Sequence, residues 1–253
     1  MTFSARILII AGSDSGGGAG IQADIKTVSA LGGHAMTAIA AITAQNTLGV
    51  SGVHSVPVDM VIAQMDAVLS DIGVDAVKIG MIGSAGTVQA VADRLEQLEG
   101  VPIVFDPVMV STSGAALADK DTIAAFERLM RIATLTTPNL LELEALGGQA
   151  AVLEKVQALL IKGGHGDGDM LTDRLIDASG SEQSWSAPRI NTPHNHGTGC
   201  TLASAIATGL GQGMDLPDAI VRARAYVRAA LKSAPGLGQG HGPMGFPVEP
   251  FSS

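Results

Sequence analysis

The chain has 253 residues, a formal net charge of −9, 46% hydrophobic residues and only 3% aromatic ones. This balance argues against a nucleic-acid partner, because such binding requires a basic surface and aromatic stacking platforms. The longest apolar runs, such as 35–42, are too short to span a membrane, and the N-terminal apolar run is too short for a signal peptide. A single cysteine cannot form an internal disulfide, so we expect a cytoplasmic protein with no membrane partner.

The first predicted unit is a strand, a glycine-rich loop and a helix. The apolar run Arg6–Ala11 is typical of a buried parallel strand, and a helical pattern covers 21–28. The loop 12–20 between them does not fit a Walker phosphate loop, because Gly18 stands where that loop needs a lysine. It also fails as a dinucleotide fingerprint, because no acidic residue follows at the required distance. The loop therefore indicates either another ligand close to the backbone or a plain flexible connection.

Strands and helices alternate along the rest of the chain. The patterns predict strand units over 34–46, 75–81, 101–109, 133–136 and 158–165, the last of which contains a lysine and two glycines. They predict helices over 57–72, 88–98 and 216–231. Two shorter strands, 170–177 and 184–190, are predicted as antiparallel additions at a sheet edge. This order predicts an α/β fold with a mostly parallel sheet covered on both faces. We expect a single domain over 1–253, with partial disorder over 245–253.

Polar or polarisable side chains follow the predicted strands where each of them ends. They are Gln45, Met81, Asp106, Asn139 and Lys162. Ligands of open parallel sheets bind outside the carboxyl ends of the strands, so we expect these residues to gather around one site.

A glycine turn precedes the helical run 202–209. Gly197 and Gly199 free the backbone to turn sharply, and the first N–H groups of the helix behind them attract negative charge. Cys200, the only cysteine, stands at this position, where a helix N-terminus favours the thiolate. The alternative is a glycine turn that leads into a core helix, with Cys200 as a small buried apolar residue.

Several motifs in this order closely resemble the hydroxymethylpyrimidine/phosphomethylpyrimidine kinases of thiamine biosynthesis. The resemblance runs from about Ile7 to Pro243 and rests on residues 11–24, 44–47, 78–81, 105–109, 137–140, 162–165 and 196–200. It implies a ribokinase-like fold, a three-layer α/β/α sandwich with a mostly parallel central sheet. It also implies phosphorylation of 4-amino-5-hydroxymethyl-2-methylpyrimidine, and then of its monophosphate, by ATP with Mg²⁺ in a homodimeric enzyme.

The resemblance also assigns roles to individual residues. Gln45 is expected to read the pyrimidine edge, in a substrate pocket lined by Gly12, Ala19, Asp24, Met81 and Val108. Asp106, Asn139, Lys162, Gly163 and Gly164 are expected at the nucleotide, with Asp106 and Glu142 at the metal. Gly197, Thr198, Gly199 and Cys200 match the anion hole, with Cys200 where related kinases usually have an aspartate base.

The assigned residue types suit phosphoryl transfer. This reaction needs positioning and charge neutralisation, which carboxylates, a lysine and helix N–H groups supply. Cys200 can accept the proton of the hydroxymethyl group if its pKa falls toward neutrality, since a free thiol titrates near 8.5. Cys200 could instead only shape the pocket.

Three segments depart from the family pattern. The chain is short between Gly148 and Lys162, which we expect to affect the adenine end of the site. His194–His196 lacks the threonine that usually precedes the histidine, and Met244–Phe246 replaces a polar ending.

Three other functions are compatible with parts of the sequence. Pyridoxal kinases share the fold and the glycine turn. A cysteine hydrolase would use Cys200 as nucleophile with His194 or His196 as base. A non-catalytic pyrimidine sensor would need no ATP.

Overall fold

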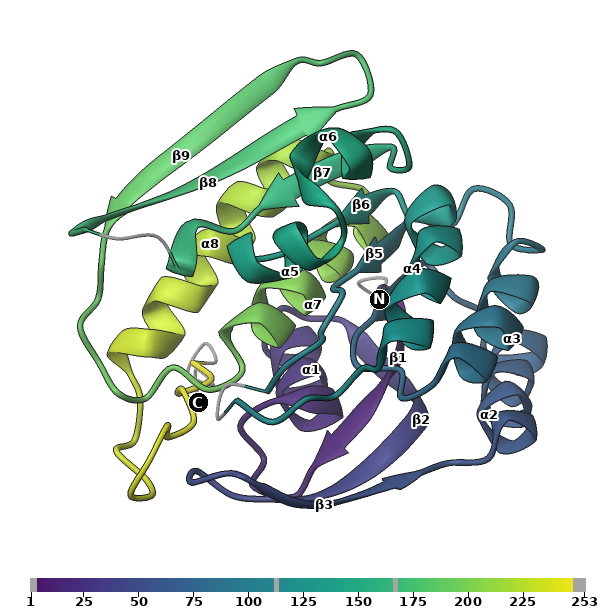
Figure 1. Ribbon diagram of the computed structural model, residues 1–253, viewed down its shortest axis with the longest axis horizontal. Helices are drawn as coiled ribbons and strands as arrows, with labels where there is room; N and C mark the ends of the chain where they lie inside the picture. Colours follow the sequence, from purple (N-terminus) through teal and green to yellow (C-terminus); the bar gives the residue numbers. More distant parts are fainter. Residues whose placement is uncertain (1–3, 112–113, 166–167, 248–253) are drawn as a thin grey trace.

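The computed structural model describes residues 4–111, 114–165 and 168–247 and has one central sheet (Figure 1). The strands are β1 Arg6–Asp14, β2 His34–Gln45, β3 Val50–Ser55, β4 Ala76–Ile79, β5 Ile103–Phe105, β6 Leu135–Thr136, β7 Ala158–Ile161, β8 Met170–Asp177 and β9 Glu182–Pro188. The helices are α1 Gly20–Ala30, α2 Val58–Asp71, α3 Ala85–Leu95, α4 Lys120–Ile132, α5 Leu140–Ala145, α6 Gly148–Leu153, α7 Thr198–Gly211 and α8 Leu216–Lys232, with a 3₁₀ turn η1 at Gly163–His165.

The sheet has the order β3-β2-β1-β4-β5-β6-β7-β8-β9. The six central strands, β2, β1, β4, β5, β6 and β7 in sheet order, pair in parallel. The edge strands β3, β8 and β9 join antiparallel. The carboxyl ends of the parallel strands therefore meet along one edge, and the loops after them form the site.

Helices cover both faces of the sheet. Leu8 and Ile10 of β1 pack in a core with α2, α3 and α4, whereas Ile7 and Ile9 pack in a second core with α1, α7 and α8. All four side chains are fully buried, as a strand covered on both faces requires. This arrangement confirms the predicted three-layer α/β/α sandwich.

The elements not predicted from the sequence include the strand β3 and the helix α4. The edge strand β3 is mostly exposed and contains a glycine, so it lacks the apolar pattern that marks a buried strand. Helix α4 has a clear amphipathic pattern, and its N-cap Asp119 accepts a hydrogen bond from the Thr122 N–H. The amphipathic pattern and the N-cap aspartate of α4 could therefore have been recognised in the sequence.

The C-terminal segment is packed as far as it is described. Met244 is buried, the Gly245 N–H donates to the Ala230 carbonyl, and Lys26 lies over the Phe246 ring. The partial disorder expected over 245–253 stays a prediction, and residues 248–253 lie outside the described residues. Within the described ranges, no helix is long and apolar enough to cross a membrane.

Candidate active site

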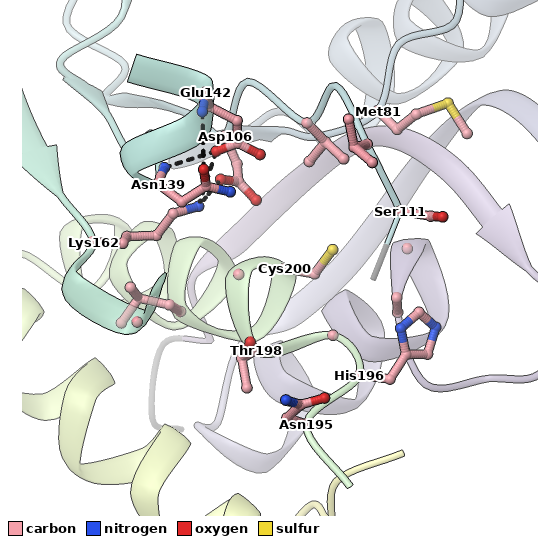
Figure 2. Close-up of a pocket in the computed structure, with 18 of the residues that line it drawn as sticks. Met81, Asp106, Ser111, Asn139, Glu142, Lys162, Asn195, His196, Thr198 and Cys200 are labelled. Atoms are coloured by element: carbon pink, nitrogen blue, oxygen red, sulfur yellow. Dashed lines mark hydrogen bonds and ion pairs between the residues drawn. The ribbon is translucent and has the colours of Figure 1, made fainter. Parts of the chain in front are cut away.

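A cavity of about 880 Å³ lies at the carboxyl ends of the strands. The side chains expected to gather at this edge all line it, namely Gln45, Met81, Asp106, Asn139 and Lys162. Figure 2 shows Asp106, Asn139, Glu142 and Lys162 on one side of Cys200, with Met81 and His196 on the other. The cavity therefore has a charged end and a less polar end, with the start of α7 between them.

The charged end is built around Asp106, which directly follows β5. Its Oδ1 accepts hydrogen bonds from Lys162 Nζ at 2.6 Å and from Thr137 Oγ1 at 3.1 Å. Lys162 Nζ also lies 3.7 Å from Glu142 Oε2. Burial alone would lower the pKa of Lys162, but Asp106 and Glu142 raise it above its ordinary value. The Lys162 ammonium therefore stays charged and is a fixed cation at the cavity wall.

Asn139 and Glu142 form a capping box at the start of α5. The Asn139 side chain accepts a hydrogen bond from the Glu142 N–H, and the Asn139 N–H donates to Glu142 Oε2 at 2.8 Å. Burial raises the pKa of Glu142, with Lys162 opposing the rise. The cap holds the Glu142 carboxyl beside Lys162, and the same cap leaves Asn139 at the cavity wall.

The glycine turn before α7 brings its first residues against the charged end. Gly197 has φ +87°, and a Cβ there would overlap the Gly18 carbonyl oxygen. A Cβ on Gly199 would lie 3.3 Å from Asp106 Oδ2 and 3.4 Å from Lys162 Nζ. Gly197, Thr198, Gly199 and Cys200 all line the cavity. Because the first turn of a helix has N–H groups without intrahelical partners, this position suits a negative charge beside Lys162.

The expectation of a favoured Cys200 thiolate is wrong for this environment. Burial raises the pKa of Cys200 to about 11, despite the opposing Lys78 ammonium and the Gly20 N–H. Asp24 and Asp106 add to the rise. Desolvation of the anion outweighs the helix terminus, so the resting group is a thiol.

Alkylation of Cys200 by iodoacetamide is expected to be slow at pH 7 and to accelerate with pH toward a midpoint of about 11. The reason is that only the thiolate reacts, and the half-buried thiol, desolvated by its surroundings, ionises late. Since Cys200 is the only cysteine, mass spectrometry of the intact protein measures its labelling directly. A midpoint at about 8.5, the value of an exposed thiol, would contradict this assignment.

Asp24 does not line the cavity, contrary to its expected place in the substrate pocket. Its fully buried carboxylate accepts hydrogen bonds from Lys78 Nζ at 2.8 and 3.0 Å and from Ser204 Oγ at 2.7 Å. Burial would lower the pKa of Lys78, but Asp24 holds it above its ordinary value. Asp24 thus neutralises Lys78, a buried cation in the cavity wall. No role was assigned to Lys78 from the sequence.

Gly163 also lies outside the cavity lining, although it was expected at the ATP phosphates. Its N–H donates to Asp173 Oδ1 at 2.9 Å, and a Cβ there would overlap the backbone of Thr172 on β8. The glycine therefore allows close packing of η1 on β8, while Gly164 does line the cavity.

The less polar end is lined by Gln45 together with the other residues expected there, Gly12, Ala19, Met81 and Val108. His196 Nε2 lies 3.0 Å from Asp14 Oδ2 and 3.1 Å from the Gln45 amide. The sequence showed His196 only as part of the glycine turn. Its contact with Asp14 spans 182 positions of the chain, and no local pattern indicates it.

Beyond Lys162 the cavity continues between the β8–β9 hairpin and α8. This part has an apolar lining of Leu171, Ala187, Ile190, Val227 and Leu231, with Arg224 and Arg228 nearby. No residue of the short segment 148–157 lines the cavity. The structure therefore gives no support to the expected effect of that shortening on this end of the site.

Sequence comparison places the chain among kinases. A sequence model of the family described as phosphomethylpyrimidine kinase matches residues 14–245. The chain is 47% identical to a hydroxymethylpyrimidine/phosphomethylpyrimidine kinase of Rhizobium meliloti, over 95% of this chain and 96% of that protein. It is also 47% identical to the thiamine biosynthesis bifunctional protein ThiED of Geobacter sulfurreducens, where 94% of this chain matches 51% of the longer protein.

Solved structures agree with this placement. The pyridoxal kinase of Staphylococcus aureus in complex with AMP-PCP and pyridoxal matches with TM-score 0.86 and 31% identity, over 96% of this chain and 93% of that one. The phosphomethylpyrimidine kinase of Clostridium difficile matches with TM-score 0.78 and 35% identity, over 90% and 99% of the two chains.

Fold and site together define a small-molecule kinase with the ribokinase-like architecture. Within that class the family match covers most of the chain, and relatives reach 47% identity along nearly their whole length. The chain belongs to the phosphomethylpyrimidine kinase family.

Proposed function

We propose that this protein phosphorylates 4-amino-5-hydroxymethyl-2-methylpyrimidine with ATP, and then phosphorylates the monophosphate to the diphosphate, in thiamine biosynthesis. The observation that carries the proposal is the cavity with two ends. Gln45 lies beside His196 in its less polar end. Lys162 and Asp106 lie in its charged end, and the N-terminus of α7 lies between the two ends (Figure 2). The names of the relatives at 47% identity support the pyrimidine as substrate.

In the proposed reaction the hydroxymethyl oxygen forms a bond to the γ-phosphorus of ATP. The bond from that phosphorus to the bridging oxygen breaks, and ADP leaves with the electron pair. Lys162 and the first N–H groups of α7 stabilise the charge on the transferred group, since fixed donors and cations need no reorganisation during the step. Cys200 accepts the proton of the attacking hydroxyl in its thiolate form, which is only a minor fraction of the resting thiol at neutral pH. Because the pKa of this thiol is about 11, kcat/KM is expected to rise with pH across the neutral range.

Asp106 and Glu142 fit Mg²⁺, which is a further part of the proposal. Asp106 Oδ1 accepts hydrogen bonds from Lys162 and Thr137, and Glu142 Oε2 accepts one from the Asn139 N–H. Within the described residues, no hydrogen bond is found to the other oxygen of either carboxylate, Asp106 Oδ2 or Glu142 Oε1. Magnesium binds oxygen ligands and takes only one or two carboxylates when phosphates supply the rest. When bound, it would neutralise charge on the ATP phosphates.

Cys200→Ala is expected to lower kcat by about a hundredfold, the usual scale for the loss of a general base. The KM values for pyrimidine and ATP are expected to change little, because the side chain acts on the proton. Steady-state kinetics at several pH values measures this, and in the variant the rise of kcat/KM with pH should disappear. Turnover near that of the wild type would remove the role from Cys200.

The decisive test of the proposed function is an ATP-coupled assay on the pyrimidine alcohol, on its monophosphate and on pyridoxal. We expect turnover of both pyrimidines with a higher kcat/KM than for pyridoxal. Failure on both pyrimidines, or an equal or higher kcat/KM on pyridoxal, would refute the substrate assignment.

Pyridoxal kinase activity is the second candidate, because solved pyridoxal kinases match this fold with TM-scores of 0.85–0.87. The hydrolase alternative has less support. The pKa of Cys200 is raised, and His196 Nε2 is within hydrogen-bond distance of Asp14 and Gln45. The sensor alternative predicts no turnover and no ATP binding, which calorimetry with ATP and Mg²⁺ measures.

Two further points are part of the proposal. The family resemblance implies a homodimer, which sedimentation analysis tests, and a cytoplasmic location, which cell fractionation tests.

A further inference from the structure

Four side chains form a hydrogen-bonded cluster at the substrate end of the cavity. They are Asp14, Thr43, Gln45 and His196, which come from β1, β2 and the turn before α7. His196 is visible in Figure 2 on the side of the cavity away from Lys162. All four line the cavity, so their polar atoms determine which ligand edge fits there.

Asp14 is held as a carboxylate. Its oxygens accept hydrogen bonds from the N–H groups of Gly16 at 2.8 Å, Gly18 at 3.0 Å and Ala19 at 2.8 Å. Burial opposes ionisation, but the bonds from His196 and the loop keep the pKa of Asp14 below its ordinary value. An acceptor-only group 3.0 Å from His196 Nε2 requires that this nitrogen carry a hydrogen and donate it.

The protonated nitrogen determines the orientation of the Gln45 amide. The structure places the amide nitrogen Nε2 3.1 Å from His196 Nε2 and the amide oxygen Oε1 3.2 Å from Thr43 Oγ1, and hydrogen bonding favours the inverse orientation. The oxygen and nitrogen of an amide have nearly the same shape, so only hydrogen bonding distinguishes the two orientations. An amide NH₂ facing the protonated imidazole nitrogen would oppose two donors. The amide oxygen must therefore face His196.

The opposite end of the amide is consistent with this orientation. Thr43 Oγ1 donates its hydrogen to the Ser13 carbonyl at 2.9 Å, so its lone pairs can accept a hydrogen bond from the Gln45 NH₂. Each of these groups then has a complementary partner. The amide keeps one N–H on the Thr43 side and one lone pair on the His196 side, and both are available to a ligand.

We propose that His196, anchored by Asp14, is a positioning residue that fixes the orientation of the Gln45 amide and thereby selects the substrate edge. The inference rests on the proposed function. The selected edge has a ring-nitrogen acceptor beside an exocyclic N–H donor, as in a 4-aminopyrimidine. A 4-oxopyrimidine has these two in the reverse order, with N3–H as donor and the exocyclic oxygen as acceptor.

The test compares kcat/KM for the 4-amino alcohol and for its 4-oxo analogue, each with saturating ATP. In the wild type we expect a preference of at least about a hundredfold for the amino compound, because the oxo compound leaves buried polar groups mispaired. In His196→Leu the amide is free to turn, and the preference is expected to fall below about tenfold. A merely structural role would lower both kcat/KM values and leave their ratio unchanged.

Two matched variants keep the test informative if His196→Leu unfolds. His196→Gln retains a side-chain N–H donor and is expected to keep most of the preference. Thr43→Val preserves volume but removes the partner of the amide NH₂, and is expected to reduce the preference. An unchanged ratio in folded His196→Leu, or in Thr43→Val if His196→Leu does not fold, would overturn the proposal. Absence of turnover of either pyrimidine by the wild type would instead refute the proposed function.

Discussion

Lys162→Met is expected to lower kcat/KM for ATP by about 10³-fold, the scale reported for the loss of a fixed cation or oxyanion donor at a transferred phosphoryl group. Lys162 Nζ is held 2.6 Å from Asp106 and 3.7 Å from Glu142. Without the ammonium, these two carboxylates would face the phosphates with uncompensated charge. Steady-state kinetics with varied ATP at fixed pyrimidine measures the loss.

The matched control is Lys232→Met, at an exposed lysine near the end of α8. It removes the same charge and adds the same side chain at a position that does not itself line the cavity, although its neighbour Leu231 does, and we expect kinetics like those of the wild type. Thermal unfolding of both variants shows whether the fold is retained. A loss of less than about tenfold in folded Lys162→Met would mean that another group neutralises the phosphate charge.

Asp24→Ala is expected to lower the free energy of unfolding by about 3–5 kcal/mol, because it leaves the Lys78 ammonium buried without its partner. Both side chains are fully buried, and Lys78 Nζ contacts both Asp24 oxygens. The pKa of Lys78, raised in the wild type by Asp24, is expected to fall below its ordinary value in the variant. Stability of the variant should therefore fall further as pH decreases and the unfolded lysine binds a proton more tightly. Urea unfolding at several pH values measures both effects.

A double variant separates loss of the ion pair from loss of packing. Asp24→Leu with Lys78→Met replaces the pair by apolar side chains of similar size, and we expect a smaller loss of stability than in Asp24→Ala. A double variant less stable than Asp24→Ala would show that packing around Ser204, rather than the unpaired charge, dominates the cost.

Much of the fold was predictable from local patterns. The alternation of apolar strands and amphipathic helices indicated a parallel sheet with two covered faces, and the polar strand ends indicated one site. Gln45, Asp106 and Lys162 do line one cavity, because parallel strands end at the same edge of the sheet. The exposed edge strand β3 was missed, since an edge strand buries too little surface to impose an apolar pattern.

The sequence alone determined the fold class, the family and the set of residues near the glycine turn. Only the tertiary structure decided what several of those residues do. Asp24 stands in a family motif but is buried against Lys78, and Gly163 packs on β8 instead of lining the cavity. Cys200 is the clearest case. Its place at a helix N-terminus predicted a lowered pKa, whereas burial beside two carboxylates raises the pKa to about 11. Motifs record which residue types are close in sequence, but ionisation depends on desolvation and on charges that folding brings together from distant parts of the chain.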